Sequence, residues 1–350
     1  MKILAVVIAL LAALPAQAKT LTVGVGQDYT DIQDALDAAS SGDVVNVLPE
    51  LYELPGGVNI RTDNVTLKGA GADQTFLDGG QKAYAVVRVN AKSVTIEGFT
   101  IQRGKDHGIY VSGSNSAEIS YNVITKNGDR GILLGDGKPW AVIDHNSFVR
   151  NKVSAVYTYR DEPRTRFTNN IFFENGRSLV TDRDSGKMTV RYNCFYGHTN
   201  DDKWVPKDKT NIEADPEFVN PDQNWLLLPG SPCLGAGENG TDIGTLGKGD
   251  YPTVEKALSR PTKGKYRVVV FAKDQQLAEK VVAVLKAAGY AGDESHTSES
   301  PNDNANIKYG AASKDDVDTM RKLTQALYGH NLEELDEFGS DDYDIFINLP

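Results

Sequence analysis

The chain has 350 residues, of which 40% are hydrophobic and 24% charged, a composition typical of soluble globular proteins and not of disordered ones. Asp and Glu outnumber Lys and Arg by 48 to 37, so no basic surplus exists to neutralise phosphates, and nucleic acid is not expected as a partner. The only two cysteines, Cys194 and Cys233, exclude a CxxC zinc site, an iron–sulfur cluster and a disulfide-dense scaffold.

Residues 1–18 have the pattern of a cleavable secretory leader. Lys2 precedes an apolar run at 3–14, and small residues at 16–18 provide a cleavage site. The run is too short to span a bilayer, and the alternative is a buried N-terminal helix. We expect cleavage after Ala18, giving a secreted or periplasmic monomer with no membrane span in the mature chain, in a compartment where cysteines can oxidise.

A short amphipathic helix is expected near residues 30–39. Thr30 and Gln33 form a capping-box pattern, and the apolar positions of one helix face are Ile32, Ala35, Leu36 and Ala39. We expect this helix to cap the N-terminal end of the repeat that follows, where it would cover apolar core and prevent strand pairing between copies.

A repeat of 23 or 24 residues runs from about residue 93 to 197. Each period contains three short β-rich runs separated by Gly, Asn and Ser, without helical spacing, which predicts an all-β parallel β-helix solenoid. The repeat is marked by asparagines in one register, which are expected to stack as a structural hydrogen-bonded ladder: Asn122, Asn146, Asn170 and Asn193. A second register is expected to stack inside the coil: Ile124, Phe148, Phe172 and Phe195.

Several segments outside the repeat resemble a known family. DYTDIQDA (28–35), SGDVV (41–45) and LPELY (48–52) resemble the opening of right-handed parallel β-helix proteins of the pectin-lyase-like group. DPEF (215–218) and PGSPC (229–233) resemble the closing segment of many secreted members. The resemblance implies a right-handed parallel β-helix domain over 19–250, closed by 211–250. It implies no single activity, because the fold carries lyases, hydrolases, epimerases and proteins with no known reaction.

After an expected linker at 251–264, residues 265–350 predict a small α/β domain with strands near 267–271, 306–309 and 344–349. Apolar residues at helical spacing predict helices near 277–288 and 313–327. The segments VVVF, IKYG and IFINL resemble the LytR C-terminal domain, which implies an interaction module of the cell envelope. AKD stands where that family usually has Asn and Gly, so the resemblance implies no ligand role for that loop. The acidic surplus is concentrated in this domain, so acidic glycans should avoid it more strongly than the coil.

One turn register could carry catalysis. It contains His107, Arg130, Val153 and Arg177, with Asp106, Asp129 and Lys152 one place earlier. His107 could act as a base and Arg130 as an anion clamp beside Asp129, as a lyase, epimerase or hydrolase acting on a glycan would require. The alternative is a ladder of solvated opposite charges.

A second group suits sugar binding, because aromatic rings stack on sugars while Arg and Asp form paired hydrogen bonds. Its members are Tyr110, Tyr157, Tyr159, Arg160, Asp161, Arg164, Asp182, Arg183 and Asp184. Asp182 and Asp184 could also supply oxygen ligands to calcium, and no other metal or cofactor is expected. Solvated turns and ion pairs are the alternative reading. If Ile109, Ile132, Ala155 and Leu179 point inward, the outward row is mostly apolar: Tyr110, Leu133, Val156 and Val180.

The third strand of each period predicts a covered face. Its outward positions are too apolar for exposure: Val123, Thr125, Val149, Ile171, Phe173, Cys194 and Tyr196. We expect residues 211–240 to cover them and Cys194 to meet Cys233, either as a disulfide or as two buried thiols. The leading function is therefore an extracytoplasmic β-helix protein that binds a cell-envelope or environmental polysaccharide. The alternative is a polysaccharide lyase, epimerase or glycoside hydrolase, and a purely structural scaffold is a third option if no glycan binds.

Overall fold

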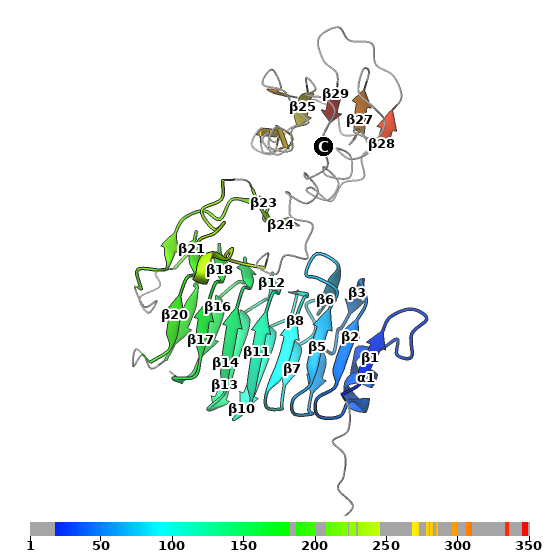
Figure 1. The fold of residues 1–350 in the computed structure, drawn as a ribbon, viewed down its shortest axis with the longest axis vertical. Helices are drawn as coiled ribbons and strands as arrows, with labels where there is room; N and C mark the ends of the chain where they lie inside the picture. The colour runs from blue at the N-terminus through cyan, green and yellow to red at the C-terminus, as the bar shows by residue number, and fades with distance from the viewer. Residues whose placement is uncertain are drawn as a thin grey trace, which may run out of the picture.

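The computed structural model describes residues 18–160, 162–182, 187–200, 208–222, 224–228 and 230–245, and beyond these the short segments 268–272, 278–279, 281–282, 285, 296–299, 306–309, 333–335 and 345–348. The first group forms a parallel β-helix, in which the chain passes through three stacked sheets in turn (Figure 1). The expected leader, apart from Ala18, and the expected linker lie outside the described residues. No helix in the described part is long and apolar enough to cross a bilayer.

The three sheets are called A, B and C in the order in which each turn visits them. Sheet A contains β1 (Thr20–Val23), β2 (Val44–Val47), β5 (Thr66–Gly69), β8 (Val94–Glu97), β11 (Ser116–Ser120), β14 (Trp140–Asp144), β17 (Arg166–Thr168) and β20 (Thr189–Arg191). Sheet B contains β3 (Glu50–Glu53), β6 (Thr75–Asp78), β9 (Thr100–Gln102), β12 (Val123–Thr125), β15 (Ser147–Val149), β18 (Ile171–Phe173), β21 (Cys194–Tyr196) and β22 (Ile212–Glu213). Sheet C contains β4 (Val58–Ile60), β7 (Ala85–Val89), β10 (His107–Gly113), β13 (Arg130–Gly137), β16 (Ser154–Thr158) and β19 (Leu179–Thr181).

The core lies inside the coil and is continuous from turn to turn. The predicted aromatic stack is present, with ring centroids of Phe148 and Phe172 5.0 Å apart and those of Phe172 and Phe195 4.8 Å apart. Both spacings match the distance between neighbouring strands, so equivalent side chains lie directly above one another. Each turn therefore buries its apolar edge against the next turn rather than on its own.

The predicted asparagine ladder is present at the corner between sheets A and B. The amide oxygen of Asn146 accepts from the backbone N–H of Asn122 at 3.0 Å, and that of Asn170 accepts from Asn146 at 2.9 Å. Residues that precede the ladder positions adopt left-handed backbone, with φ of 56° at Tyr121 and 52° at His145. That conformation is costly for these residue types, and the buried hydrogen bonds of the ladder offset the cost.

A second ladder runs along the corner between sheets B and C. The amide oxygen of Asn151 accepts from the side chain of Asn127 at 2.9 Å, and that of Asn175 accepts from Asn151 at 2.9 Å. The sequence shows these residues only as a recurrent turn. Their stacking means that two of the three corners are held by buried amide networks.

The short helix α1 (Ile32–Ala38) forms where expected and contributes Ile32, Ala35 and Leu36 to the core. The predicted capping box is wrong by one residue. Asp31 is the N-cap, and its carboxylate accepts from the backbone N–H groups of Gln33 and Asp34. A carboxylate at the helix N-terminus also gains from the helix dipole, which a Thr30 hydroxyl would not.

The inward and outward rows of sheet C differ from the expected ones by one residue at β16. Val156, not Ala155, is paired with Ile132, so Val156 points inward. The outward row is Arg88, Tyr110, Leu133, Tyr157 and Val180. The pairing of β10 with β13 shifts by one residue between Val111 opposite Leu134 and Gly113 opposite Gly137, so β13 contains one extra residue, and Ser154 rather than Val153 is therefore paired with Arg130. A single-residue shift exchanges the faces of a strand, and the outward row is more aromatic than expected.

The outward face of sheet B is covered, as expected, by the closing segment. This segment includes β23 (Phe218–Asn220), β24 (Asn224–Leu227) and the short helix η1 (Glu238–Gly240), and it runs beside β18 and β21 (Figure 1). A second apolar core forms between the two layers: Val123, Val149, Ile171, Phe173, Cys194, Phe218, Trp225, Leu227, Cys233 and Ile243. Of the two expected states of the cysteine pair, the structure has the two buried thiols and not the disulfide. Cys194 and Cys233 are buried free cysteines that are in contact, and their mutual hydrogen bond and their burial raise the pKa of Cys233.

The described C-terminal segments include a five-stranded sheet in the order β26-β25-β29-β27-β28. Three of its strands lie at or within one residue of predicted ones: β25 (Val268–Ala272), β27 (Asn306–Tyr309) and β29 (Ile345–Asn348). Two were not predicted: β26 (His296–Glu299) and β28 (Glu333–Leu335). Ala278, Val281 and Leu285 are helical and buried, while the helix predicted at 313–327 lies outside the described residues.

Candidate functional site

The outward face of sheet C carries two pairs of tyrosines, together called the tyrosine strip: Tyr84 with Tyr110, and Tyr157 with Tyr159. The rings of Tyr84 and Tyr110 lie edge to face with centroids 5.9 Å apart, and those of Tyr157 and Tyr159 do so at 5.3 Å. Tyr159 lies close enough to Tyr110 to contribute to the rise in the pKa of Tyr110, which burial causes first. The strip therefore crosses the sheet from the turn before β7 to β16.

Two arginines flank this tyrosine strip. The guanidinium of Arg88 lies 5.5 Å from the ring centroid of Tyr84, and that of Arg130 lies 4.4 Å from the ring centroid of Tyr157. Arg130 also forms an ion pair with Asp129. The Nε atoms of both arginines are buried and have no hydrogen-bond partner among the described residues. The strip thus combines aromatic rings with two guanidinium groups.

Tyr157 is also part of a polar contact at one end of the strip. Its hydroxyl donates to the carboxylate of Asp182, and burial followed by this hydrogen bond raises the pKa of Tyr157 to about 12. Tyr157 is therefore a neutral donor at physiological pH. Of the predicted binding residues, the structure brings Tyr110, Tyr157, Tyr159 and Asp182 together.

His107 lies beneath the strip rather than on it. It is paired with Arg130 on the neighbouring strand, as expected, but only 2% of its surface is exposed. The ring of Tyr84 covers it edge to face at 5.1 Å. Burial lowers the pKa of His107, against the charge of Asp129, so the imidazole is neutral near pH 7. A neutral histidine is a competent base, but this one has no surface that a substrate could reach without movement of Tyr84.

Gly135 on β13 leaves room for the most central ring. A Cβ atom at this position would overlap the ring of Tyr110 and lie 2.9 Å from its hydroxyl oxygen. Tyr110 can therefore lie flat across β13, where Asp136 and Tyr159 are its electrostatic neighbours. The sequence alone does not indicate this role, because the glycine is two residues away from the position paired with Tyr110.

Other predicted binding residues lie elsewhere. Arg164 pairs with Glu162 at 2.9 Å and lies over the ring of Trp140 on sheet A, so it does not belong to the strip. Arg160 is exposed at the end of β16, where its backbone bonds to Thr158. Three predicted residues lie outside the described part: Asp161, Arg183 and Asp184. The calcium expectation at Asp182 and Asp184 therefore stays a prediction.

Tyr84, Arg88 and Asp136 were missed by sequence reasoning. Tyr84 and Arg88 lie one turn before the segment in which the repeat is evident. Tyr84 directly precedes β7 and Arg88 lies on it, and this strand could have been found by extending the repeat back by 22 residues from His107 to Ala85. No group of three metal-binding side chains occurs among the described residues.

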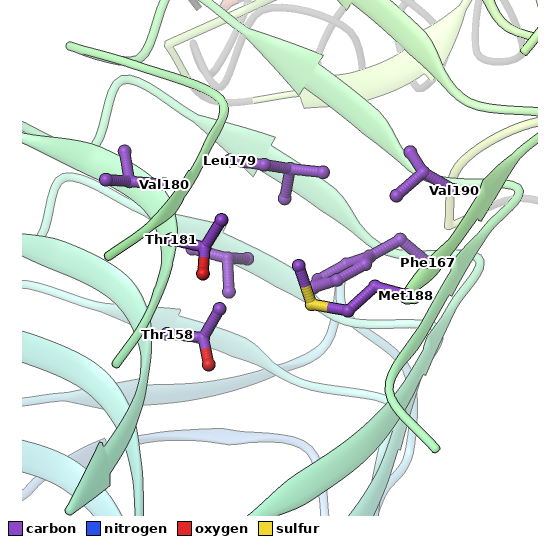
Figure 2. A pocket seen from close by; sticks show the side chains of 8 residues that line it. Thr158, Phe167, Leu179, Val180, Thr181, Met188 and Val190 are labelled. Atoms are coloured by element: carbon purple, nitrogen blue, oxygen red, sulfur yellow. The ribbon is translucent and has the colours of Figure 1, made fainter. Parts of the chain in front are cut away.

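Neither of two cavities suits a bound sugar on this face. One lies inside the last turn of the coil and is lined by Phe167, Leu179, Met188 and Val190 (Figure 2). Its volume of about 10 Å³ is barely that of one water, so it is a packing defect at the end of the core. The other lies at the N-terminal end against β3 and is described below.

Comparison with known proteins supports the fold. Residues 56–172 and 84–201 match a family model described as a right handed beta helix region. No curated protein matches the chain by sequence. The described residues between 18 and 245 form a parallel β-helix, as the sequence predicts.

Three solved structures are similar in part to this chain. The pectin methylesterase of Aspergillus niger is 14% identical over 57% of this chain and 84% of its own, with a TM-score of 0.32. That of carrot is 12% identical over 58% and 83%, with a TM-score of 0.34. That of Erwinia chrysanthemi is 12% identical over 53% and 79%, with a TM-score of 0.26. At these values no activity is transferred to this chain.

Proposed function

We propose that this protein binds a polysaccharide along the outward face of sheet C. The observation that supports the proposal is the strip of four tyrosines flanked by Arg88 and Arg130. Aromatic faces stack on the apolar faces of sugar rings, while guanidinium groups donate paired hydrogen bonds to hydroxyl or carboxylate oxygens. The strip crosses the four strands β7, β10, β13 and β16, about 14 Å at 4.8 Å per strand, which is long enough for a chain rather than a single sugar.

A second candidate function is catalysis on such a glycan by a lyase, epimerase or hydrolase. The observation that favours it is the neutral His107 paired with Arg130, because a base beside a cation suits proton removal next to a carboxylate. Burial of His107 beneath Tyr84 disfavours it, and binding is therefore the leading function.

A glycan array followed by titration of the best ligand tests the binding proposal. Tyr157→Ala should weaken binding about tenfold or more, because truncating an aromatic contact residue to alanine can cost about 2 kcal/mol of binding free energy. Tyr196→Ala is the control, since Tyr196 is an exposed tyrosine (39%) on sheet B, away from the strip. Equal affinities of the two variants for every ligand of the wild-type protein would overturn the proposal.

Catalysis is tested separately by following absorbance of unsaturated uronate products and release of reducing ends. Product formation by the wild-type protein that is abolished in His107→Ala but retained in Tyr196→Ala would replace the binding-only proposal with the enzymatic one. A correctly folded His107→Ala variant is required, and its thermal unfolding provides that check, because His107 is buried.

We extend the proposal to the whole chain. Its leader directs it out of the cytoplasm, with cleavage after Ala18, and residues 265–350 form a module, similar to the LytR C-terminal domain, that contacts the cell envelope. In that oxidising compartment Cys194 and Cys233, already in contact, form a disulfide. The mature protein is proposed to act as a monomer. Mass spectrometry of the secreted chain would test the cleavage site and the bond together.

A further inference from the structure

The first complete turn of the coil consists of β2, β3 and β4, and the position above each strand is occupied differently. On sheet A, β1 pairs with β2 along its whole length, from Thr20 opposite Val44 to Val23 opposite Val47. The added strand therefore satisfies the edge of β2, and β1 in turn forms a bridge from Val23 to Tyr29.

On sheet C, a side chain takes the place of a strand. The amide oxygen of Gln33 on α1 accepts from the backbone N–H of Asn59 at 2.7 Å, and its amide nitrogen donates to the carbonyl of Asn59 at 3.1 Å. These are the two hydrogen bonds that a parallel neighbour would make with the outward-pointing residue of β4. Two of the three sheet edges at this end are thus filled from within the chain.

On sheet B, β3 is the terminal strand and no described residue pairs with its outer side. The backbone N–H of Leu54, which directly follows β3, donates to Asp78 of β6 at 2.7 Å. Backbone groups of successive residues point to opposite sides of a strand, so Leu51 and Glu53 direct theirs away from β6. A row of unused backbone donors and acceptors of this kind is a template for another strand.

A cavity of about 260 Å³ lies against this edge. One side is formed by Gly24, Val25 and residues 30–32, and the other by Glu50–Glu53 together with Leu54. Val25 is 82% exposed and Leu51 is 52% exposed, the two highest values among the large hydrophobic side chains of the described part. Space, unpaired backbone and exposed apolar side chains therefore coincide at the outer edge of β3.

The charge of this cavity is entirely negative. Asp31, Glu50 and Glu53 line it, and no Lys, Arg or His does. Asp31 is engaged as the N-cap of α1, whereas Glu50 and Glu53 are exposed. A cationic partner is favoured, because opposite charges on adjacent strands attract and like charges directly opposite repel.

We propose that the outer edge of β3 accepts an extended basic peptide segment of a partner protein as an additional strand. The added strand would complete the turn that β1 and Gln33 complete on the other two sheets. Side chains alternate along a strand, so an apolar residue would stack over Leu51 and a Lys or Arg two residues later would stack over Glu53.

The test uses the full-length protein and a fluorescein-labelled peptide, Lys-Val-Thr-Lys-Thr, in a fluorescence anisotropy titration at low ionic strength. Two control peptides are matched to it: one with Glu in place of both Lys, and one N-methylated at the amides that would face β3. We expect each control to bind about fivefold more weakly or worse, because the first loses charge attraction and the second loses backbone hydrogen bonds. Equal binding of the N-methylated peptide would overturn the proposal, since recognition by charge alone needs no strand.

Protein variants test the same contact from the other side. Leu51→Pro removes an N–H that points to the open edge and should weaken binding about fivefold, while Leu51→Ala keeps the N–H and should bind better than Leu51→Pro. Glu53→Lys should reverse the preference, so that the Glu peptide binds more tightly than the Lys peptide. If Leu51→Pro does not fold, the Glu53→Lys variant alone provides the test from the protein side. A Glu53→Lys protein that still binds the Lys peptide more tightly than the Glu peptide would contradict the proposal.

Discussion

The outward faces of sheets B and C come from the same turns of one repeat, yet they are built for different purposes. On sheet B the outward row is Val123, Val149, Ile171, Phe173 and Cys194, and the closing segment buries it. On sheet C the outward row is Arg88, Tyr110, Leu133, Tyr157 and Val180, and no described segment forms a second layer over it. The inward rows, in contrast, are equally apolar on both sheets.

In this fold the inward side chains determine that the coil forms, and the outward side chains determine which segment or ligand can pack on each face. An apolar outward row requires a cover, and the chain supplies one. An outward row of aromatic and charged side chains can face water and remain available to a ligand. The predictions below challenge this division, beginning with the largest expected effect.

Phe173→Ala and Tyr157→Ala provide the most direct comparison. Phe173 contacts Phe218 of the closing segment with ring centroids 5.4 Å apart, and its loss leaves a cavity between two layers. We expect Phe173→Ala to lower the free energy of unfolding by about 3–5 kcal/mol and Tyr157→Ala by about 1 kcal/mol or less. Urea unfolding followed by circular dichroism measures both. Equal losses would show that the two faces do not differ in packing.

Oxidation of Cys194 and Cys233 should strengthen the covered face alone. The bond would close a loop with 38 intervening residues and is expected to stabilise the protein by about 3–4 kcal/mol in a model of lost chain entropy. Free thiols are counted in denatured protein before and after oxidation, and unfolding is measured in parallel with a Cys233→Ser variant. Two titratable thiols that persist after secretion would contradict the proposed bond.

Asn146→Ala should destabilise the whole coil, and with it the faces of sheets B and C alike. The ladder at the corner between sheets A and B holds each turn to the next. The side chain of Asn146 donates to the carbonyl of Ile119 at 2.7 Å and accepts from the backbone of Asn122 at 3.0 Å. Leaving these buried groups without partners should cost about 2–3 kcal/mol. Asn90→Ala is the control, because Asn90 is an exposed asparagine bonded to Asn59. A smaller loss for Asn146→Ala than for the control would be inconsistent with the ladder.

The attachment of the closing segment should also weaken in acid. Asp144 accepts hydrogen bonds from Thr168 at 2.6 Å and Asn169 at 3.0 Å and pairs with His145, whose other ring nitrogen lies 3.4 Å from Thr241 of the closing segment. Burial alone would raise the pKa of Asp144, but these hydrogen bonds outweigh it and the pKa is lowered.

A carboxyl group whose pKa is lowered by folding stabilises the protein above its unfolded pKa of about 4 and loses that contribution as the pH falls through the folded value. The free energy of unfolding should therefore decrease between pH 5 and pH 3, and the decrease should be smaller in Asp144→Asn. Urea titrations at the two pH values measure it. If the free energy of unfolding decreases equally in the wild type and the variant, Asp144 does not cause the loss of stability in acid.

The fold could be predicted from the sequence because its signals are periodic. The Asn122 register and the Phe148 register each recur once per turn, and a stacked coil places such residues above one another. The covered face of sheet B was predictable for a related reason, since an unbroken apolar row cannot remain exposed.

The candidate site was predictable only in part, because its geometry depends on single-residue differences in turn length. One extra residue in β13, where its pairing with β10 shifts, decides that Tyr157 rather than Val156 points outward. Burial of His107 depends on Tyr84, which lies a full turn earlier in the chain. The open edge of β3 is recognised only by comparison with β1 and Gln33, which no local pattern contains.

The asparagine ladder also makes the length of this molecule adjustable. Asn211 joins the ladder 2.9 Å from the backbone of Asn193 although it follows by only 18 residues, so the stack accepts a chain that shortens its path between corners. Whole turns could therefore be added or removed upstream without changing the contacts at either end. Duplicating residues 122–145 should extend the tyrosine-bearing sheet by one strand, or about 4.8 Å. The length of polymer that such a protein can contact then depends on how many repeats it contains, and duplication of one repeat in the gene changes that number in a single step.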